Sequence, residues 1–129
     1  MDKTMLVIDD DAATLKLETL FFSGKGYTVY TASDGDVGVE LALQHKPSTI
    51  LCDVMMGKMH GFEVLRTLRT HPDMKQTVII MTSAKAYKPD IDRARLLGAT
   101  DYFVKPFRLY ELLDVVERHL ASFGQQAPA

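Results

Sequence analysis

Cysteine and tryptophan are scarce in this 129-residue chain, which has one cysteine, Cys52, and no tryptophan. A single cysteine forms no disulfide within a chain, and this favours a reducing compartment such as the cytoplasm. No apolar run reaches the roughly 20 residues needed to cross a bilayer, and no signal-peptide pattern is found. The formal net charge of −2 gives no basic surface for nucleic acid or an anionic membrane. We therefore expect a small cytoplasmic domain with no direct nucleic-acid or membrane binding.

Short apolar, β-branched segments alternate along the chain with stretches of helical periodicity. Apolar residues make up 47% of the sequence, which is typical of a globular domain with its own core. The third and fourth segments are apolar throughout, as expected of parallel strands covered on both faces. The predicted strands span residues 5–8, 27–31, 49–52, 78–81 and 102–104.

Capping residues and apolar spacing predict five helices between and after these strands. Asp11 is placed to cap the first helix, whose buried face is expected to carry Leu17, Leu20 and Phe21. In the second helix, Val37 and Leu41 form an i, i+4 apolar pair. The predicted helices span residues 11–24 or 11–26, 34–45, 61–70, 90–97 and 108–123.

Five successive β-α units with right-handed crossovers form a parallel sheet with helices on both faces. The predicted fold class is therefore α/β, with a doubly wound five-stranded parallel sheet. One domain is expected over residues 1–124, because Gly124 is placed to end the last helix and leave residues 125–129 as a flexible tail. Ligands of such sheets bind at the carboxyl ends of the strands, so the functional residues are expected there.

Polar residues stand directly after four of the five predicted strands. Asp9 and Asp10 follow the first strand, Asp53 the third, Thr82 the fourth and Lys105 the fifth. The three carboxylates carry about −3, and Lys105 with one Mg²⁺ supplies about +3, so the charges balance only with metal bound. A lysine and a hydroxyl aimed at one point suit a phosphoryl group, and a carboxylate can be the nucleophile that accepts it. This edge of the sheet therefore predicts a metal-dependent phosphoryl site.

Four segments at these strand ends resemble the motifs of a response-regulator receiver domain, the phosphoacceptor module of bacterial two-component signalling. The resemblance covers residues 4 to about 122, and its motifs are residues 6–10 (LVIDD), 53–56 (DVMM), 78–83 (VIIMTS) and 102–107 (YFVKPF). It implies a flavodoxin-like (βα)5 fold with strand order 2-1-3-4-5. It also implies a signalling domain rather than an enzyme, with only self-catalysed phosphotransfer and autodephosphorylation.

The resemblance implies a role for each acid. Asp53 would be the phosphoacceptor and would receive the phosphoryl group from a phosphohistidine on a sensor histidine kinase or a histidine phosphotransfer protein. Asp9 and Asp10 would hold Mg²⁺ or Mn²⁺, with Asp53 and the backbone carbonyl of Met55 as further ligands.

It also implies how the signal would leave the site. Thr82 and Lys105 would contact the phosphoryl oxygens, and Pro106 would hold the Lys105 loop, where the family commonly has a cis peptide. Tyr102 matches an aromatic switch position that turns inward once Thr82 moves toward the phosphate. A downstream protein would then bind the face formed by the fourth helix, the fifth strand and the fifth helix. The chain would be a monomer or a weak phosphorylation-dependent dimer.

One loop departs from the family pattern. Residues 57–61 read Gly57-Lys58-Met59-His60-Gly61, where the family usually has proline and glycine and then an acid or amide before the next glycine. Without the fixed φ of proline, this loop is expected to be less rigid.

Two other functions stay open at this point. A degenerate receiver would act as a constitutive docking module without accepting phosphate, although the intact acids, threonine and lysine argue against it. A phosphohydrolase of the haloacid-dehalogenase type also begins with a carboxylate after its first strand, and Asp9-x-Asp11 superficially fits its opening motif. However, Ala13 stands where that family has Thr or Val, and the chain is short and lacks the late acidic pair.

Overall fold

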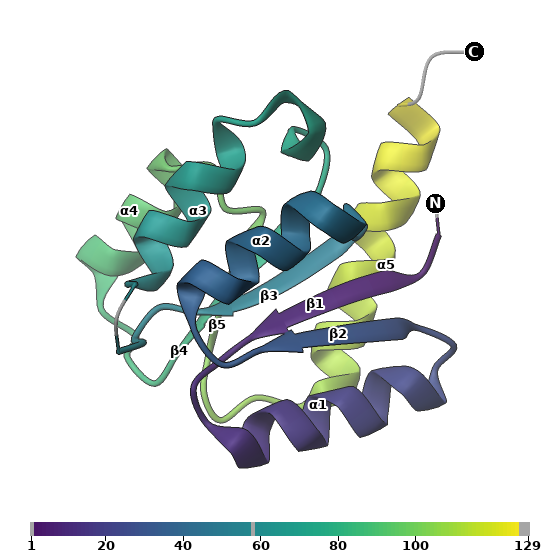
Figure 1. The fold of residues 1–129 in the computed structure, drawn as a ribbon, viewed down its shortest axis with the longest axis horizontal. Coiled ribbons are helices and arrows are strands. Elements are labelled where there is room, and N and C mark those ends of the chain that lie inside the picture. Colours follow the sequence, from purple (N-terminus) through teal and green to yellow (C-terminus); the bar gives the residue numbers. More distant parts are fainter. Residues whose placement is uncertain (1, 58, 127–129) are drawn as a thin grey trace.

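Five parallel strands form one sheet in the order β2-β1-β3-β4-β5 (Figure 1). The computed structural model describes residues 2–57 and 59–126. All four neighbouring strand pairs are parallel, which confirms the predicted α/β fold class and strand order. The strands are β1 (Thr4–Ile8), β2 (Thr28–Ala32), β3 (Thr49–Asp53), β4 (Val78–Ser83) and β5 (Asp101–Val104).

Helices cover both faces of the sheet, with α2, α3 and α4 on one face and α1 and α5 on the other (Figure 1). None of the helices described is both long and apolar enough to cross a membrane. The helices are α1 (Ala12–Gly24), α2 (Gly35–His45), α3 (Gly61–Arg69), the 3-10 helix η1 (Pro72–Met74), α4 (Lys88–Leu96) and α5 (Leu109–Gln126).

Two apolar cores, one on each face, hold the sheet between the helix layers. Leu6 and Ile8 of β1 lie in the core beneath α2, α3 and α4, whereas Met5 and Val7 lie in the core beneath α1 and α5. The two sets alternate because successive side chains of a strand point to opposite faces. Each such side chain contributes roughly 1.5–3 kcal/mol when fully buried. Burial on both faces fixes the strand register, and with it the position of the residue that follows each strand.

The buried face of α1 is not the predicted one. Leu17 and Leu20 are 59% and 64% exposed, whereas Glu18 and Phe22 are buried. Phe21 is only partly buried, against the core beneath α1 and α5. Apolar residues surround much of this helix, so their spacing is compatible with more than one inward face.

Helix α2 also faces the sheet with residues that the apolar spacing did not select. Leu41 of the predicted pair packs against the core, but Val37 is 42% exposed, whereas Gly38 and Ala42 are buried. A Cβ at position 38 would lie 2.6 Å from Cδ1 of Ile8, so the absence of a side chain lets the helix approach β1 closely. Hydrophobic periodicity does not detect a face that is selected for small size.

Two helix boundaries differ from the predicted ones. Helix α4 begins at Lys88, with Pro89 in its first turn, where the missing N–H of proline costs no hydrogen bond. Helix α5 continues past Gly124 to Gln126, because a glycine inside a helix costs only about 1 kcal/mol relative to alanine. The first two residues of the predicted tail are therefore helical, and residues 127–129 lie outside the described residues.

Candidate functional site

The carboxyl ends of the strands meet at one edge of the sheet and bring the predicted site residues together. Asp53 and Thr82 are register partners across β3 and β4. Asp9 comes directly after β1, the other neighbour of β3. The backbone amide of Lys105 donates to the Ser83 carbonyl at 2.7 Å, which extends the pairing of β4 and β5 beyond the strand end. We call this edge, with Asp9, Asp10, Asp53, Thr82 and Lys105, the acidic rim.

Three carboxylates of the acidic rim lie close enough to share one ion. Side-chain oxygens of Asp9, Asp10 and Asp53 lie within 4.8 Å of one another. Asp9 and Asp53 are buried, whereas Asp10 is exposed. A divalent cation such as Mg²⁺ takes hard oxygen ligands, commonly one or two carboxylates together with waters and phosphate oxygens. This donor set fits the predicted metal.

Lys105 extends into the acidic rim from the end of β5. Its Nζ donates a hydrogen bond to Oδ2 of Asp9 at 2.8 Å and lies 3.6 Å from Oδ2 of Asp53. Burial acts to lower the pKa of Lys105, but the Asp9 hydrogen bond and the charges of Asp53 and Asp9 outweigh it and raise the pKa. The ammonium group therefore stays charged and offsets one of the three negative charges.

The Asp53 carboxyl has a raised pKa, chiefly because it is buried. The charge of Lys105 opposes this shift, while the charges of Asp9 and Asp10 add to it. The backbone amide of Met55 faces Oδ1 of Asp53 at 3.3 Å and favours the anion. Since the unfavourable causes prevail, a further positive charge beside Asp53 would stabilise its ionised, nucleophilic form.

Tyr102 and Ser83 connect the sheet to the loop before α4. Tyr102 is half-buried, and its hydroxyl donates to the backbone carbonyl of Lys85 at 3.1 Å. Ser83, which follows the buried Thr82, accepts a hydrogen bond on its hydroxyl from the Lys85 amide at 3.1 Å. The loop at Lys85 is therefore held by both β4 and β5.

Helix α3 begins in close contact with the end of β3. A Cβ at Gly61 would lie 2.7 Å from the Cα of Val54 and closer still to the backbone oxygen of Asp53, so only glycine fits. The preceding residue, His60, caps the helix, because its Nδ1 accepts a hydrogen bond from the Phe62 amide at 3.3 Å. An imidazole cap thus holds the end of the loop in which the sequence lacks the usual proline.

Two further predictions, about residues next to the acidic rim, are confirmed. The Asp11 carboxylate caps α1 by accepting hydrogen bonds from the Thr14 hydroxyl at 2.5 Å and the Thr14 amide at 3.0 Å, which lowers the pKa of Asp11. Asp11 is thus a helix cap and not part of the three-carboxylate cluster. The peptide bond between Lys105 and Pro106 is cis.

Comparison with protein families agrees with this geometry. The family model described as "Response regulator receiver domain" matches residues 5–117. The chain is a response-regulator receiver domain. This confirms the resemblance inferred from the motifs and places the protein in two-component signalling. Receiver domains bind Mg²⁺ at their acidic pocket and receive their signal from a histidine kinase.

Curated relatives of this receiver domain are longer proteins. It is 39% identical over 116 residues to the transcriptional regulatory protein HprR of Escherichia coli K12, covering 90% of this chain and 51% of the relative. It is also 39% identical over 129 residues to the alkaline phosphatase synthesis transcriptional regulatory protein PhoP of Bacillus subtilis 168, covering 100% and 53%. The chain thus spans about half the length of the curated relatives it matches. Because these relatives are transcriptional regulators, the expectation of no nucleic-acid partner is not supported.

Solved structures show the same fold. The chemotaxis protein CheY4 of Vibrio cholerae is 29% identical with a TM-score of 0.86, and the match covers 92% of this chain and 98% of that one. A CheY-like receiver domain protein from Methanospirillum hungatei is 23% identical with a TM-score of 0.92, covering 98% and 100%. The second likeness concerns the fold alone.

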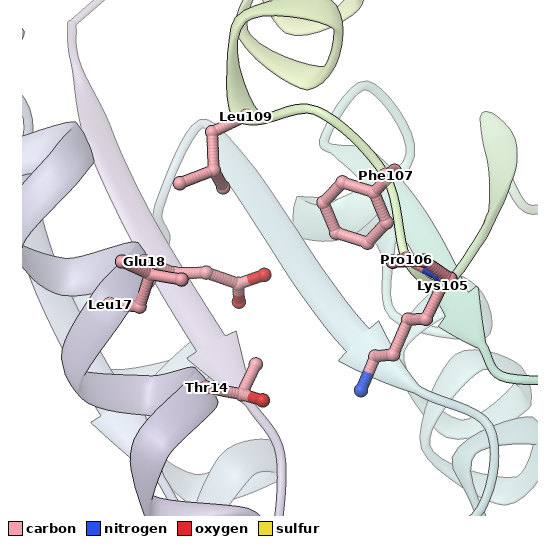
Figure 2. A pocket seen from close by; sticks show the side chains of 7 residues that line it. All are labelled: Thr14, Leu17, Glu18, Lys105, Pro106, Phe107 and Leu109. Atoms are coloured by element: carbon pink, nitrogen blue, oxygen red, sulfur yellow. The ribbon is translucent and has the colours of Figure 1, made fainter.

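The receiver domain carries a buried acid, Glu18, that the sequence interpretation missed. Glu18 is 4% exposed, and its carboxylate points from α1 toward the loop after β5 (Figure 2). Burial, and then the negative charge of Asp9, raises the pKa of Glu18 to about 7. Leu15, Glu18 and Phe22 follow i, i+3, i+7 spacing, which is the signal that places Glu18 on the inward face. Its charge argues for an outward position, so hydrophobic spacing alone favours the face that carries Leu17 and Leu20.

Proposed function

We propose that this receiver domain accepts a phosphoryl group on Asp53 from the phosphohistidine of a histidine kinase or histidine phosphotransfer protein. An oxygen of Asp53 would form the new P–O bond while the P–N bond to histidine breaks. The observation that carries the proposal is the position of the Asp53 carboxylate, grouped with two further carboxylates and 3.6 Å from the Lys105 ammonium. Phosphoryl transfer depends mainly on positioning and charge stabilisation, and these neighbours provide both.

Asp9, Asp10 and Asp53, with the backbone carbonyl of Met55, would hold Mg²⁺ or Mn²⁺. The bound cation would supply positive charge to phosphoryl oxygens. Asp9 is already oriented for this role, because its Oδ1 accepts a hydrogen bond from the Asp11 amide at 2.9 Å while its Oδ2 accepts one from the lysine. The protein thus holds Asp9 in place, and the exposed Asp10 would complete the ligand set.

Lys105 and Thr82 would bind the phosphoryl oxygens. The ammonium group of Lys105 lies between Asp9 and Asp53, so a small displacement exchanges the Asp9 contact for one with a phosphoryl group on Asp53. Thr82 is the register partner of Asp53 on the neighbouring strand and is positioned to offer a hydroxyl donor. Both donors belong to strand ends that the sheet already fixes beside Asp53, so only small side-chain movements are needed to bring them to the developing charge.

Tyr102 would carry the signal to a downstream protein through the face of α4, β5 and α5. The Tyr102 hydroxyl holds the loop at Lys85, which follows Thr82 by three residues. Movement of Thr82 toward a phosphoryl group would disturb this loop and let Tyr102 turn inward. Phosphorylation would then shift the population toward the form that binds the target.

The domain is proposed to act as a phosphoacceptor and not as an enzyme with multiple turnovers. The haloacid-dehalogenase alternative needs Asp11 beside the reacting phosphoryl group, but the Asp11 carboxylate is engaged as the cap of α1. The grouped acids and lysine likewise favour phosphate acceptance over a purely constitutive docking module.

Labelling with acetyl phosphate tests the proposal. Wild-type protein with Mg²⁺ should gain one hydroxylamine-labile phosphoryl group, measured by intact mass, and omission of the cation should prevent this. Asp53→Asn should not be labelled, whereas Asp36→Asn, which changes an exposed aspartate of α2, should behave as wild type. Labelling of Asp53→Asn at the wild-type level would overturn the assignment, and repeated hydrolysis of phosphomonoesters would favour the phosphohydrolase.

A further inference from the structure

A cavity of about 250 Å³ opens beside the acidic rim, between α1 and the loop that joins β5 to α5 (Figure 2). Thr14, Leu17 and Glu18 line it from α1, and Phe107 and Leu109 line it from the opposite side. Small-molecule sites commonly enclose roughly 300–1,000 Å³, so this cavity lies just below that range and has room only for a small ligand. We call it the α1 cavity.

Glu18 directs a carboxylate into the α1 cavity (Figure 2). The residue is 96% buried, and no hydrogen bond or ion pair to its carboxylate is found among the residues that the structure describes. Its oxygens are not among the fully enclosed polar atoms without a partner, so the carboxylate reaches the open space of the cavity. A buried ionised carboxylate without a partner is costly, and this cost appears as the raised pKa of Glu18. A cationic ligand at this point would provide the missing partner.

The charges around the α1 cavity favour a cation. Lys105 lies on the cavity wall, but its ammonium is committed to Asp9 and Asp53 at 2.8 and 3.6 Å. When ionised, Asp9, Asp53 and Glu18 together carry about −3 against about +1 from the lysine, which leaves a net negative field. An anionic ligand would be repelled here.

The rest of the α1 cavity is largely apolar. Leu17, Pro106, Phe107 and Leu109 form its walls, and the Phe107 ring is packed edge-on against Phe103 with 5.5 Å between centroids. A flat apolar body can pack against such an aromatic wall. An amidinium or guanidinium group can meanwhile form two parallel hydrogen bonds with a carboxylate.

We propose that the α1 cavity binds a small organic cation, an amidine or amine on an apolar body, with its cationic group on the Glu18 carboxylate. The apolar body lies against Leu17, Phe107 and Leu109. This site is separate from the acidic rim and shares only the Lys105 side chain with it. The proposal does not depend on phosphorylation of Asp53.

Benzamidine is the probe, and its neutral isostere benzamide is the matched ligand control. In ¹⁵N NMR titrations of the whole chain, benzamidine should shift the amides of Leu17, Glu18, Phe107 and Leu109 saturably and bind at least tenfold more tightly than benzamide. Glu18→Gln should remove this tenfold preference. Glu40→Gln, which changes an exposed glutamate of α2, should retain it.

A second variant tests the apolar wall independently of the charge. Phe107→Ala should weaken both probes while leaving their ratio unchanged, and unaltered binding would overturn the placement of the apolar body. Equal benzamidine affinity in wild type and Glu18→Gln, no saturable shift, or shifts centred on Asp10 would overturn the site. A preference for benzamide would identify a neutral apolar ligand and overturn the cation assignment.

Discussion

Glu18 gives the native state a pH-dependent cost at the scale of a single residue. Its pKa is about 7 in the folded protein and 4.5 for an ordinary glutamate, because burial and then Asp9 oppose ionisation while Lys105 favours it. Below the ordinary pKa the carboxyl is protonated in both states, and the cost is absent. As the pH rises between the two values, the unfolded chain ionises first, so the native state loses about 3 kcal/mol of stability.

Glu18→Gln is therefore expected to be more stable than wild type at about pH 8, by about 3 kcal/mol, and nearly equal to it at about pH 4.5. The measurement is urea unfolding at several pH values, with Glu40→Gln as the exposed-residue control. A stability difference that stays constant across this range would show that the charge of Glu18 is not the cause.

Among single residues, the sequence predicts the grouping of the acidic rim well and the inward position of Glu18 poorly. Asp9, Asp53, Thr82 and Lys105 are each found where an apolar strand ends or just beyond it, and parallel pairing carries such residues to one edge. Their grouping thus follows from local pattern and topology alone. Glu18 does not follow a strand, and its helical spacing is compatible with an inward position without requiring one, since its direction depends on which side of α1 docks on the sheet. That choice is made by packing across the molecule.

The junction of β3 and α3 makes the stability of a whole element depend on one glycine. A methyl group at Gly61 would meet the backbone of Asp53 and Val54, which cannot rotate away as a side chain can. We expect Gly61→Ala to cost about 1–3 kcal/mol and to slow labelling of Asp53, because α3 must withdraw from the strand end. Gly57 provides a control in the same loop, since a Cβ there meets nothing within 4 Å.

Gly57→Ala is expected to change stability by less than about 0.5 kcal/mol. Chemical unfolding and acetyl phosphate labelling of the two variants give the comparison. Equal effects of the two substitutions would mean that the loop adapts and that the close approach of α3 has no consequence.

The existence and order of the elements could be predicted because strands covered on both faces are nearly free of polar residues. The docking faces of the helices were harder to predict. Gly38 faces Ile8 because it is small, and Leu17 stays exposed although it is apolar. Hydrophobic spacing reports the apolar character of a helix face but not the size of its side chains, and both properties decide how a helix packs.

For the molecule as a whole, Tyr102 is expected to couple the acidic rim to the α4, β5 and α5 face. A beryllium-fluoride adduct on Asp53 should mimic the phosphoryl group and shift NMR signals of residues 84–97 and Tyr102 more than those of α2. Tyr102→Ala should still bind beryllium fluoride but show smaller shifts in α4, because the contact with Lys85 is lost. A twentyfold gain in target affinity corresponds to about 1.8 kcal/mol of coupling, within the usual allosteric range.

Tyr110→Ala is the matched control, since Tyr110 is 66% exposed and lies near Phe21 of α1. It should leave the response of α4 intact. The coupling would be contradicted if beryllium fluoride shifted the NMR signals of α2 most, or if Tyr102→Ala left the shifts in α4 unchanged.

The burial of Cys52 makes the reactivity of its thiol a measure of how often the sheet opens. The residue is 1% exposed in the middle of the sheet, and burial raises the pKa of its thiol, so a thiol reagent reacts only after the sheet has opened. Because Cys52 immediately precedes Asp53, the rate at which its thiol is alkylated reports the opening of the strand that carries the proposed phosphoacceptor. A ligand that binds the closed form slows this alkylation, and Cys52 is the single thiol of the sequence, so the reaction reports on this strand alone.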